Sequence, residues 1–152
     1  SRVSRGLGDV YKRQFPYSVK YNSAFYGPFR EAAKSSPNFG DRKTYQMNFK
    51  NSEEAINEVK LDINEGADVI IIKPAISYLD IIYRIKQKFN VPIIAYNVSG
   101  EYTMVKSASE KNFINGIETI LEILHSIKRS GANAIISYHA LEVAKYLKAN
   151  DL

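Results

Sequence analysis

Lys73 is the residue whose type and place point most directly to chemistry. It follows an aliphatic run, residues 69–72, that is typical of a strand buried on both faces. A lysine at the carboxyl end of such a strand lies where β/α barrels keep their active sites. Poor solvation of the ammonium would lower its pKa and free the amine to attack carbonyl carbons. Position alone fits equally well a lysine that ends the strand and reaches out to water.

Polar residues also follow two other aliphatic runs, at 91–96 and 134–137. Asn97 and Ser99 come after the first, and Tyr138 comes after the second. Hydroxyl groups gathered beside a reactive amine suit the recognition of a carboxylate or carbonyl substrate. Taken singly, each fits an ordinary strand-to-helix turn, in which Ser99 merely caps the next helix.

The segment 20–46 has the least regular pattern and is rich in Gly, Pro and Tyr. Two turns within it present Arg30 and Arg42. Two guanidinium groups over a barrel mouth could hold a carboxylate bidentately, although both also fit ordinary surface arginines. A loop of this length is more often functional than filler.

Helical and strand patterns alternate from residue 51 onward. Apolar residues at helical spacing, or residues typical of helix ends, predict helices near 52–66, 76–89, 101–109, 117–131 and 141–147. This alternation indicates parallel strands with helical crossovers, as in a β/α barrel or an open doubly wound sheet. Three clear strands are too few for either fold, since a full barrel takes about 250 residues. We therefore expect a part of the fold to be missing upstream.

Composition narrows the class of protein. The 152 residues include no cysteine, so this segment holds neither a disulfide nor a thiolate metal site. No stretch approaches the roughly 20 apolar residues of a membrane helix, and the start lacks the apolar core of a signal peptide. The expected compartment is therefore the cytoplasm, with no membrane partner.

The net charge of +5 is unevenly distributed. A cluster near the start carries +3 of it, with Asp9 set against four basic residues, Arg2, Arg5, Lys12 and Arg13. The remaining chain mixes both signs, which is typical of a solvated surface and argues against a nucleic-acid partner.

The motifs together resemble the porphobilinogen synthase (5-aminolevulinate dehydratase) family. The segments that carry the resemblance keep their order and spacing, and they are 17–21, 25–33, 39–47, 72–75, 78–80, 96–102 and 136–138. The resemblance runs from about Tyr17 to the carboxyl terminus. It implies an α/β fold over 17–152, the truncated C-terminal half of a TIM-type (β/α)8 barrel.

The resemblance implies an enzyme that condenses two 5-aminolevulinate molecules into porphobilinogen, with loss of two waters, in tetrapyrrole (heme and chlorophyll) synthesis. Lys73 would form an imine with the substrate that becomes the propionate side, whose carboxylate Ser99 and Tyr138 would hold. Lys20 would form the imine with the second substrate. The carboxylate of that substrate would be bound by three polar side chains, those of Arg30, Arg42 and Gln46.

Metals and self-association are also implied by the resemblance. Glu58 sits where many members have a glutamate that supports an allosteric Mg²⁺ near a subunit interface. It fits a solvent-facing helix glutamate as well. The active-site Zn²⁺ or Mg²⁺ would take its ligands from the missing N-terminal half, and the whole protein would form a homo-octamer or homo-hexamer.

Residues 1–16 depart from the family pattern. Charged residues and Pro16 stand where an apolar strand should lead into Lys20. We interpret 1–16 as a foreign leader, disordered or artefactual, and expect Lys73 but not Lys20 to keep its native backbone setting. Because a half-barrel leaves sheet edges open, the chain alone should fold weakly, aggregate or be inert. The alternatives are another Schiff-base barrel such as a class I aldolase, which needs one lysine, and a non-catalytic fragment.

Overall fold

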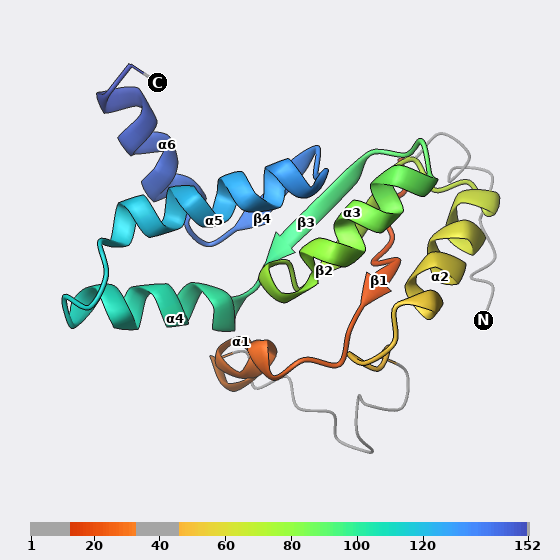
Figure 1. The fold of residues 1–152 in the computed structure, drawn as a ribbon, viewed down its shortest axis with the longest axis horizontal. Coiled ribbons are helices and arrows are strands. Elements are labelled where there is room, and N and C mark those ends of the chain that lie inside the picture. Colours follow the sequence, from red (N-terminus) through yellow and green to blue (C-terminus); the bar gives the residue numbers. More distant parts are fainter. Residues whose placement is uncertain (1–12, 33–45, 152) are drawn as a thin grey trace.

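A parallel four-stranded sheet organises the chain. The computed structural model describes residues 13–32 and 46–151, so residues 1–12, and Arg42 within 33–45, lie outside the described part. The strands lie side by side in sequence order, as β1 (Val19–Lys20), β2 (Ile70–Lys73), β3 (Ile93–Asn97) and β4 (Ala134–Ser137) (Figure 1). Neighbouring parallel strands joined by helical crossovers are the repeating unit of β/α folds.

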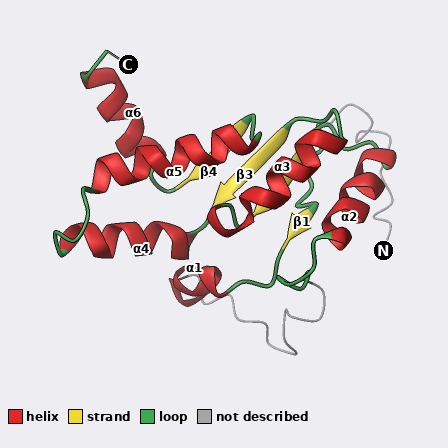
Figure 2. Cartoon of the chain, viewed as in Figure 1, coloured by secondary structure: helices red, strands yellow, loops and turns green. Residues whose placement is uncertain are grey.

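Helices connect the strands and extend beyond them (Figure 2). They are α1 (Gly27–Ala32), α2 (Glu53–Asn64), α3 (Leu79–Lys88), α4 (Ser99–Glu110), α5 (Gly116–Ser130) and α6 (Ala140–Ala149). The longest, α5, has clear sequence signals at both ends. The Asn115 side chain accepts a hydrogen bond from the Glu118 N–H at its start, and Gly131, with φ +125°, follows its last residue.

The two faces of the sheet differ in what covers them. Helices α2, α3 and α5 lie over one face (Figure 1). The strand side chains on that face belong to the main core and are fully buried, among them Val19, Ile70, Ile72 and Ile93. Because side chains alternate along a strand, the residues between these point to the other face. Lys20 and Lys73 belong to that second set.

The structure contradicts the expectation that Lys20 would lack its strand. In β1, Val19 pairs with Ile72 and Lys20 with Lys73. The chain before it is also joined to the sheet, since the Ile71 N–H donates to the Pro16 carbonyl at 2.9 Å. Proline lacks only the donor, so its carbonyl remains available to a neighbouring strand. Lys20 therefore keeps a strand setting, while the domain boundary at residue 16 stays a prediction.

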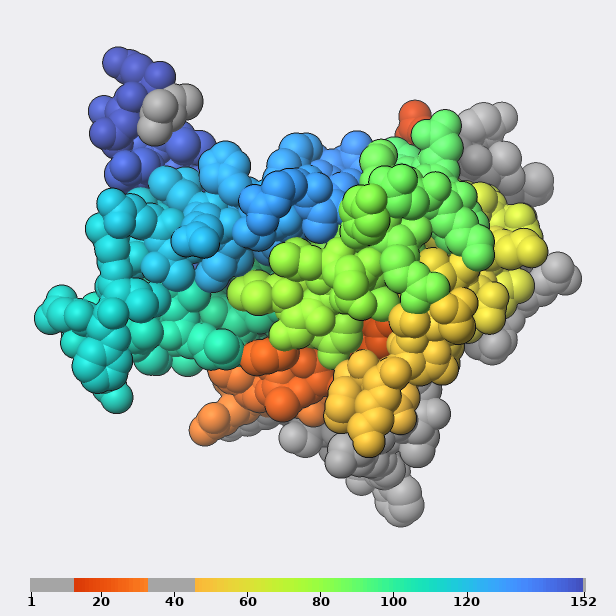
Figure 3. All heavy atoms as spheres, viewed as in Figure 1, coloured from red at the N-terminus to blue at the C-terminus, as the bar shows by residue number. Residues whose placement is uncertain are grey.

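The last helix stands apart from the sheet. Figure 3 shows α6, in dark blue, projecting from the body of the molecule. A second, smaller apolar cluster of Val105, Ile120 and Val143 joins α4, α5 and α6. Among the described helices, none is long and apolar enough to cross a membrane.

Candidate active site

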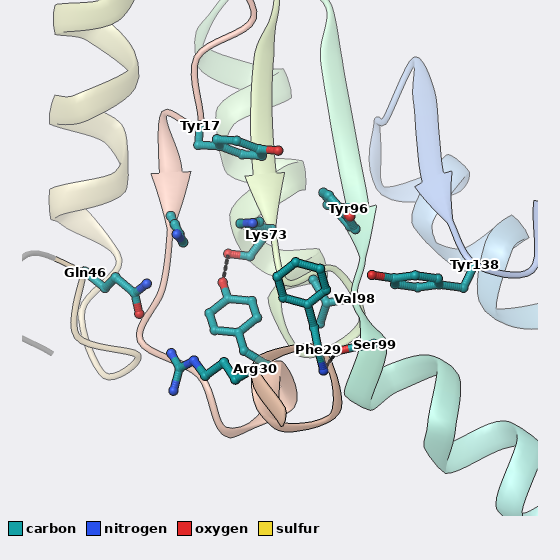
Figure 4. A pocket seen from close by; sticks show the side chains of 11 residues that line it. Tyr17, Phe29, Arg30, Gln46, Lys73, Tyr96, Val98, Ser99 and Tyr138 are labelled. Atoms are coloured by element: carbon teal, nitrogen blue, oxygen red, sulfur yellow. Dashed lines mark hydrogen bonds between the residues drawn. The ribbon is translucent and has the colours of Figure 1, made fainter. Parts of the chain in front are cut away.

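A pocket, partly open to solvent, lies at the carboxyl ends of the strands (Figure 4). Six of the residues singled out in the sequence line it, namely Lys20, Arg30, Gln46, Lys73, Ser99 and Tyr138. The other lining residues are Tyr17, Tyr26, Phe29, Tyr96 and Val98. Two predicted site residues are not among them. Arg42 lies outside the described residues, and Glu58 lies on α2.

Strand pairing brings the two lysines together. Lys20 and Lys73 end neighbouring strands and are partners in the parallel register. Partners in a sheet project from the same face, so both amines enter one pocket although 53 positions separate them in the sequence. The geometry suits two amines that work on adjoining molecules.

Aromatic rings surround the Lys73 ammonium. Its Nζ lies 4.3 Å from the centre of the Tyr17 ring, 5.0 Å from that of Tyr96 and 5.5 Å from that of Tyr26. The faces of such rings attract cations and exclude water from one side. The Tyr26 hydroxyl also donates to the Lys73 carbonyl oxygen at 3.2 Å, which ties the strand end to the 3-10 helix Ala24–Tyr26 that precedes α1.

Two of these phenols titrate above their ordinary range. Burial raises the pKa of Tyr26, and the buried phenol of Tyr78 beside it adds to the rise. Burial also raises the pKa of Tyr96, with a further contribution from a hydrogen bond with Tyr138. Both phenols therefore stay protonated at neutral pH and act as hydrogen-bond donors.

Ser99 and Tyr138 enter the pocket from the turns after β3 and β4 (Figure 4). Ser99 is the first residue of α4 and is buried, and its hydroxyl accepts a hydrogen bond from the Phe29 N–H at 3.1 Å. It thereby joins α1 to α4. Tyr138 is 47% exposed, and its ring lies 5.6 Å from that of Tyr102. Its phenol is accessible to a ligand in the pocket.

Arg30 and Gln46 carry unused hydrogen-bonding capacity. Nε and Nη2 of Arg30 and both amide atoms of Gln46 are buried and have no hydrogen-bond partner among the described residues. The Arg30 guanidinium lies 5.4 Å from the centre of the Tyr26 ring. Buried polar atoms are costly when left unpaired, so these donors are suited to an anionic ligand such as a carboxylate.

Glu58 is separate from this pocket. It is exposed on α2, and no group of three acidic, histidine or cysteine side chains that could hold a metal occurs within 13–32 and 46–151. A solvated carboxylate fits Mg²⁺ that keeps most of its waters, and a lone one provides a single ligand. The donor set for a tightly held metal is not within the described residues.

Sequence reasoning predicted one tyrosine of the pocket, Tyr138, and missed three others. Tyr17, Tyr26 and Tyr96 surround Lys73. For Tyr96 a signal existed, because it ends an aliphatic run as Lys73 does. Tyr17 and Tyr26 lie in segments that carry the family resemblance, but no local pattern indicates that either ring reaches Lys73.

Comparison with known proteins agrees with the fold and the pocket. The delta-aminolevulinic acid dehydratase family matches residues 11–146. Proteins of that name from Bacillus subtilis and Synechocystis are 56% and 57% identical, over 86% and 87% of this chain. The chain spans about two fifths of the length of these curated relatives.

A solved structure is similar over nearly the whole described fold. It is the delta-aminolevulinic acid dehydratase (porphobilinogen synthase) of Toxoplasma gondii ME49, in complex with the reaction product porphobilinogen. The TM-score is 0.85 at 48% sequence identity, over 90% of this chain and 39% of that one. The predicted fold class, part of a β/α barrel, is confirmed. The chain belongs to the delta-aminolevulinic acid dehydratase family.

Proposed function

We propose that this chain provides both reactive lysines of a porphobilinogen synthase, which joins two 5-aminolevulinate molecules. The observation that carries the proposal is the register of Lys20 with Lys73, which places two amines in one pocket. Membership of the family supports it. Because the chain spans two fifths of its relatives, the activity is proposed for the whole protein.

The chemistry requires two ketones to be activated differently. A neutral lysine amine adds to the ketone carbon of 5-aminolevulinate, and loss of water leaves a C=N bond. The imine makes the neighbouring carbon more acidic and the imine carbon more electrophilic. Two 5-aminolevulinate molecules thus give one porphobilinogen and two waters, and both lysines return to the free amine. Holding the two imines side by side replaces an encounter between two dissolved molecules.

Separate anion sites would keep two identical substrates in different roles. On the Lys73 side, the hydroxyls of Ser99 and Tyr138 would bind the carboxylate of the propionate-side substrate. On the Lys20 side, Arg30, Gln46 and Arg42 would bind the other carboxylate. The unpartnered buried atoms of Arg30 and Gln46 support the second assignment.

The test uses a completed protein, in which residues 11–152 follow the amino-terminal part of the Bacillus subtilis relative. Borohydride reduction in the presence of 5-aminolevulinate should attach label to Lys73 and Lys20, located by mass spectrometry. Porphobilinogen should form, and Lys60→Ala, an exposed lysine on α2, should leave the label and the product unchanged. Label spread over surface lysines, with no product, would contradict the proposal.

The two competing readings predict different labels. A class I aldolase would be trapped at one lysine by an aldolase substrate and would not release porphobilinogen. A non-catalytic fragment would give no specific label in any context. For the 152-residue chain alone, we expect little or no product, and turnover equal to that of the completed protein would contradict this.

Metal dependence is a property of the family. For the whole protein we propose an allosteric Mg²⁺ near Glu58 and an active-site Zn²⁺ or Mg²⁺. We further propose that it forms a homo-octamer or homo-hexamer in the cytoplasm. In the completed protein, Glu58→Gln should weaken activation by added Mg²⁺, whereas Glu122→Gln on α5 should not. Equal Mg²⁺ titrations for the two variants would remove Glu58 from the assignment. Light scattering measures the assembly.

A further inference from the structure

Glu101 is a buried carboxylate outside the pocket lining. It lies in the first turn of α4 and is 1% exposed. Its Oε1 accepts hydrogen bonds from the backbone N–H groups of Ala75 at 3.0 Å and Ile76 at 2.7 Å. Its Oε2 accepts from the Val98 N–H at 2.8 Å and from Asn97 Nδ2 at 3.0 Å. Every partner is an N–H donor, so both oxygens serve as acceptors.

These donors come from the turns after two different strands. Ala75 and Ile76 follow Lys73 at the end of β2, and Asn97 and Val98 lead from β3 into the helix that begins at Ser99. One carboxylate therefore joins the turn that carries Lys73 to the turn that carries Ser99. Hydrogen bonds to an ionised group away from water are strong and directional, so this junction resists displacement.

Asn97 extends the connection to a third strand. Its Oδ1 accepts a hydrogen bond from the Ser137 hydroxyl at 2.8 Å. The Ser137 oxygen in turn accepts from the His139 N–H at 3.1 Å, across the turn that contains Tyr138. The chain of hydrogen bonds thus links the ends of β2, β3 and β4, at each of which polar side chains line the pocket.

Helix capping does not account for this arrangement. An acidic residue at the third helical position often accepts from the N-cap N–H, which here is the Val98 bond. A solvated carboxylate performs that role without being buried. The bonds from Ala75, Ile76 and Asn97 serve groups outside α4, and burial raises the pKa of Glu101 against the opposing effect of its donors. Desolvation of this carboxylate costs free energy, and the N–H donors of the two turns offset that cost only while the strand ends keep their positions.

We propose that Glu101 is a positioning residue, which holds Lys73, Ser99 and Tyr138 at their mutual distances through these backbone turns and through Asn97 and Ser137. Its catalytic consequence rests on the proposed function, because Lys73 must meet a ketone carbon held by the other groups. Displacement of a reacting group by about 1 Å is enough to cost roughly a hundredfold in rate.

The decisive variant is Glu101→Gln in the completed protein, with Glu110→Gln as the matched control, exposed at the end of the same helix. The amide keeps the size of the side chain but turns an N–H group toward either Ala75 and Ile76 or Asn97 and Val98. The rate constant of imine formation at Lys73, followed by borohydride quench, should fall roughly ten- to a hundredfold. Glu110→Gln should leave it unchanged.

The rate constant separates positioning from general stability. A variant that only unfolds more easily loses labelled protein but keeps the rate constant of its folded fraction. Adding Asn97→Asp to Glu101→Gln lets the new amide donate to the new carboxylate, and should recover part of the rate. Amide hydrogen exchange at residues 75, 76 and 98 should be faster in Glu101→Gln than in Glu110→Gln.

Each outcome bears on one claim. An unchanged rate constant in Glu101→Gln, with the parent labelling normally, would overturn the positioning role. If the parent itself fails to label Lys73, the proposed function fails. Amide hydrogen exchange then remains as the test of whether Glu101 holds the two turns in place. Unchanged exchange at all three amides would overturn the proposal in that case.

Discussion

The two lysines of the pocket have different surroundings. Three tyrosine rings enclose the Lys73 ammonium, and the turn after Lys73 is bound by the buried carboxylate of Glu101. Lys20 ends a strand of two residues, and its neighbours Arg30 and Gln46 keep buried polar atoms without partners within the described residues. One side of the pocket is preorganised by the chain itself, and the other retains binding capacity for a ligand.

The difference follows from how the strands are held. Strand β2 lies between β1 and β3 and is buried among aliphatic side chains, so its end has little freedom. Strand β1 pairs with β2 on one side. On its other side the described contact is a single hydrogen bond to Lys20, from the Met47 N–H to the Lys20 carbonyl at 3.1 Å. Under the proposed function each side holds one imine and one carboxylate. The chain itself fixes the amine on the Lys73 side, whereas the Lys20 side keeps unpaired donors for its carboxylate.

Loss of Lys73 should have the largest effect. In the completed protein, Lys73→Ala should lower porphobilinogen formation at least about a thousandfold, because no other amine occupies that position. Lys20→Ala should also abolish product but leave borohydride label on Lys73, since the Lys73 side does not depend on Lys20. Disappearance of that label in Lys20→Ala would break the proposed independence of the two sides.

Removal of the Arg30 guanidinium should act on binding. Arg30→Ala should raise the half-saturating concentration of 5-aminolevulinate by roughly thirtyfold, as expected for about 2 kcal/mol of lost charged hydrogen bonding. Arg129→Ala, an exposed arginine on α5, is the control. Steady-state kinetics measures both, and an unchanged half-saturating concentration in Arg30→Ala would mean that its unpaired atoms do not face the substrate.

A methyl group at Gly100 should disturb the junction between α4 and the 3-10 helix Ala24–Tyr26. A Cβ there would lie 2.5 Å from the Phe25 carbonyl oxygen, so the backbone would have to move. Gly100→Ala should therefore reduce the free energy of unfolding by about 1–3 kcal/mol. Gly27→Ala meets no atom within 4 Å and should stay close to the parent. Equal thermal midpoints for the two variants would show that the backbone at this junction can move without a loss in the free energy of unfolding.

The smallest effect should come from His139, the buried residue that precedes α6. Burial lowers the pKa of His139, although Glu142 opposes the shift and Lys106 adds to it. The neutral imidazole stabilises the fold above the ordinary histidine pKa of about 6.5, and this contribution is lost as the pH falls through the lower pKa of the folded state. Thermal midpoints between pH 7 and pH 5 should fall less in His139→Gln than in the parent. An identical pH dependence would contradict this.

Much of this molecule follows from sequence pattern. The aliphatic runs at 69–72, 91–96 and 134–137 each predict a strand, and all three strands form. Burial follows the pattern in β2 and β3, whereas Ala134 and Ile136 of β4 are exposed. The helix ends at Asn115 and Gly131 likewise follow from local chemistry. The motifs sufficed to assign the family, since they preserve spacing as well as residue type.

Other features depend on contacts between distant segments. A charged, proline-containing approach to Lys20 indicated a lost strand, yet the Pro16 carbonyl still joins the sheet. Glu101 was visible in a motif, but its role depends on N–H groups 25 and 26 positions earlier. The sequence by itself determined which residues could react and which strands carry them. Tertiary structure alone decided which tyrosines face Lys73 and which carboxylate holds its turn, because strand register and backbone hydrogen bonds between turns leave no local pattern.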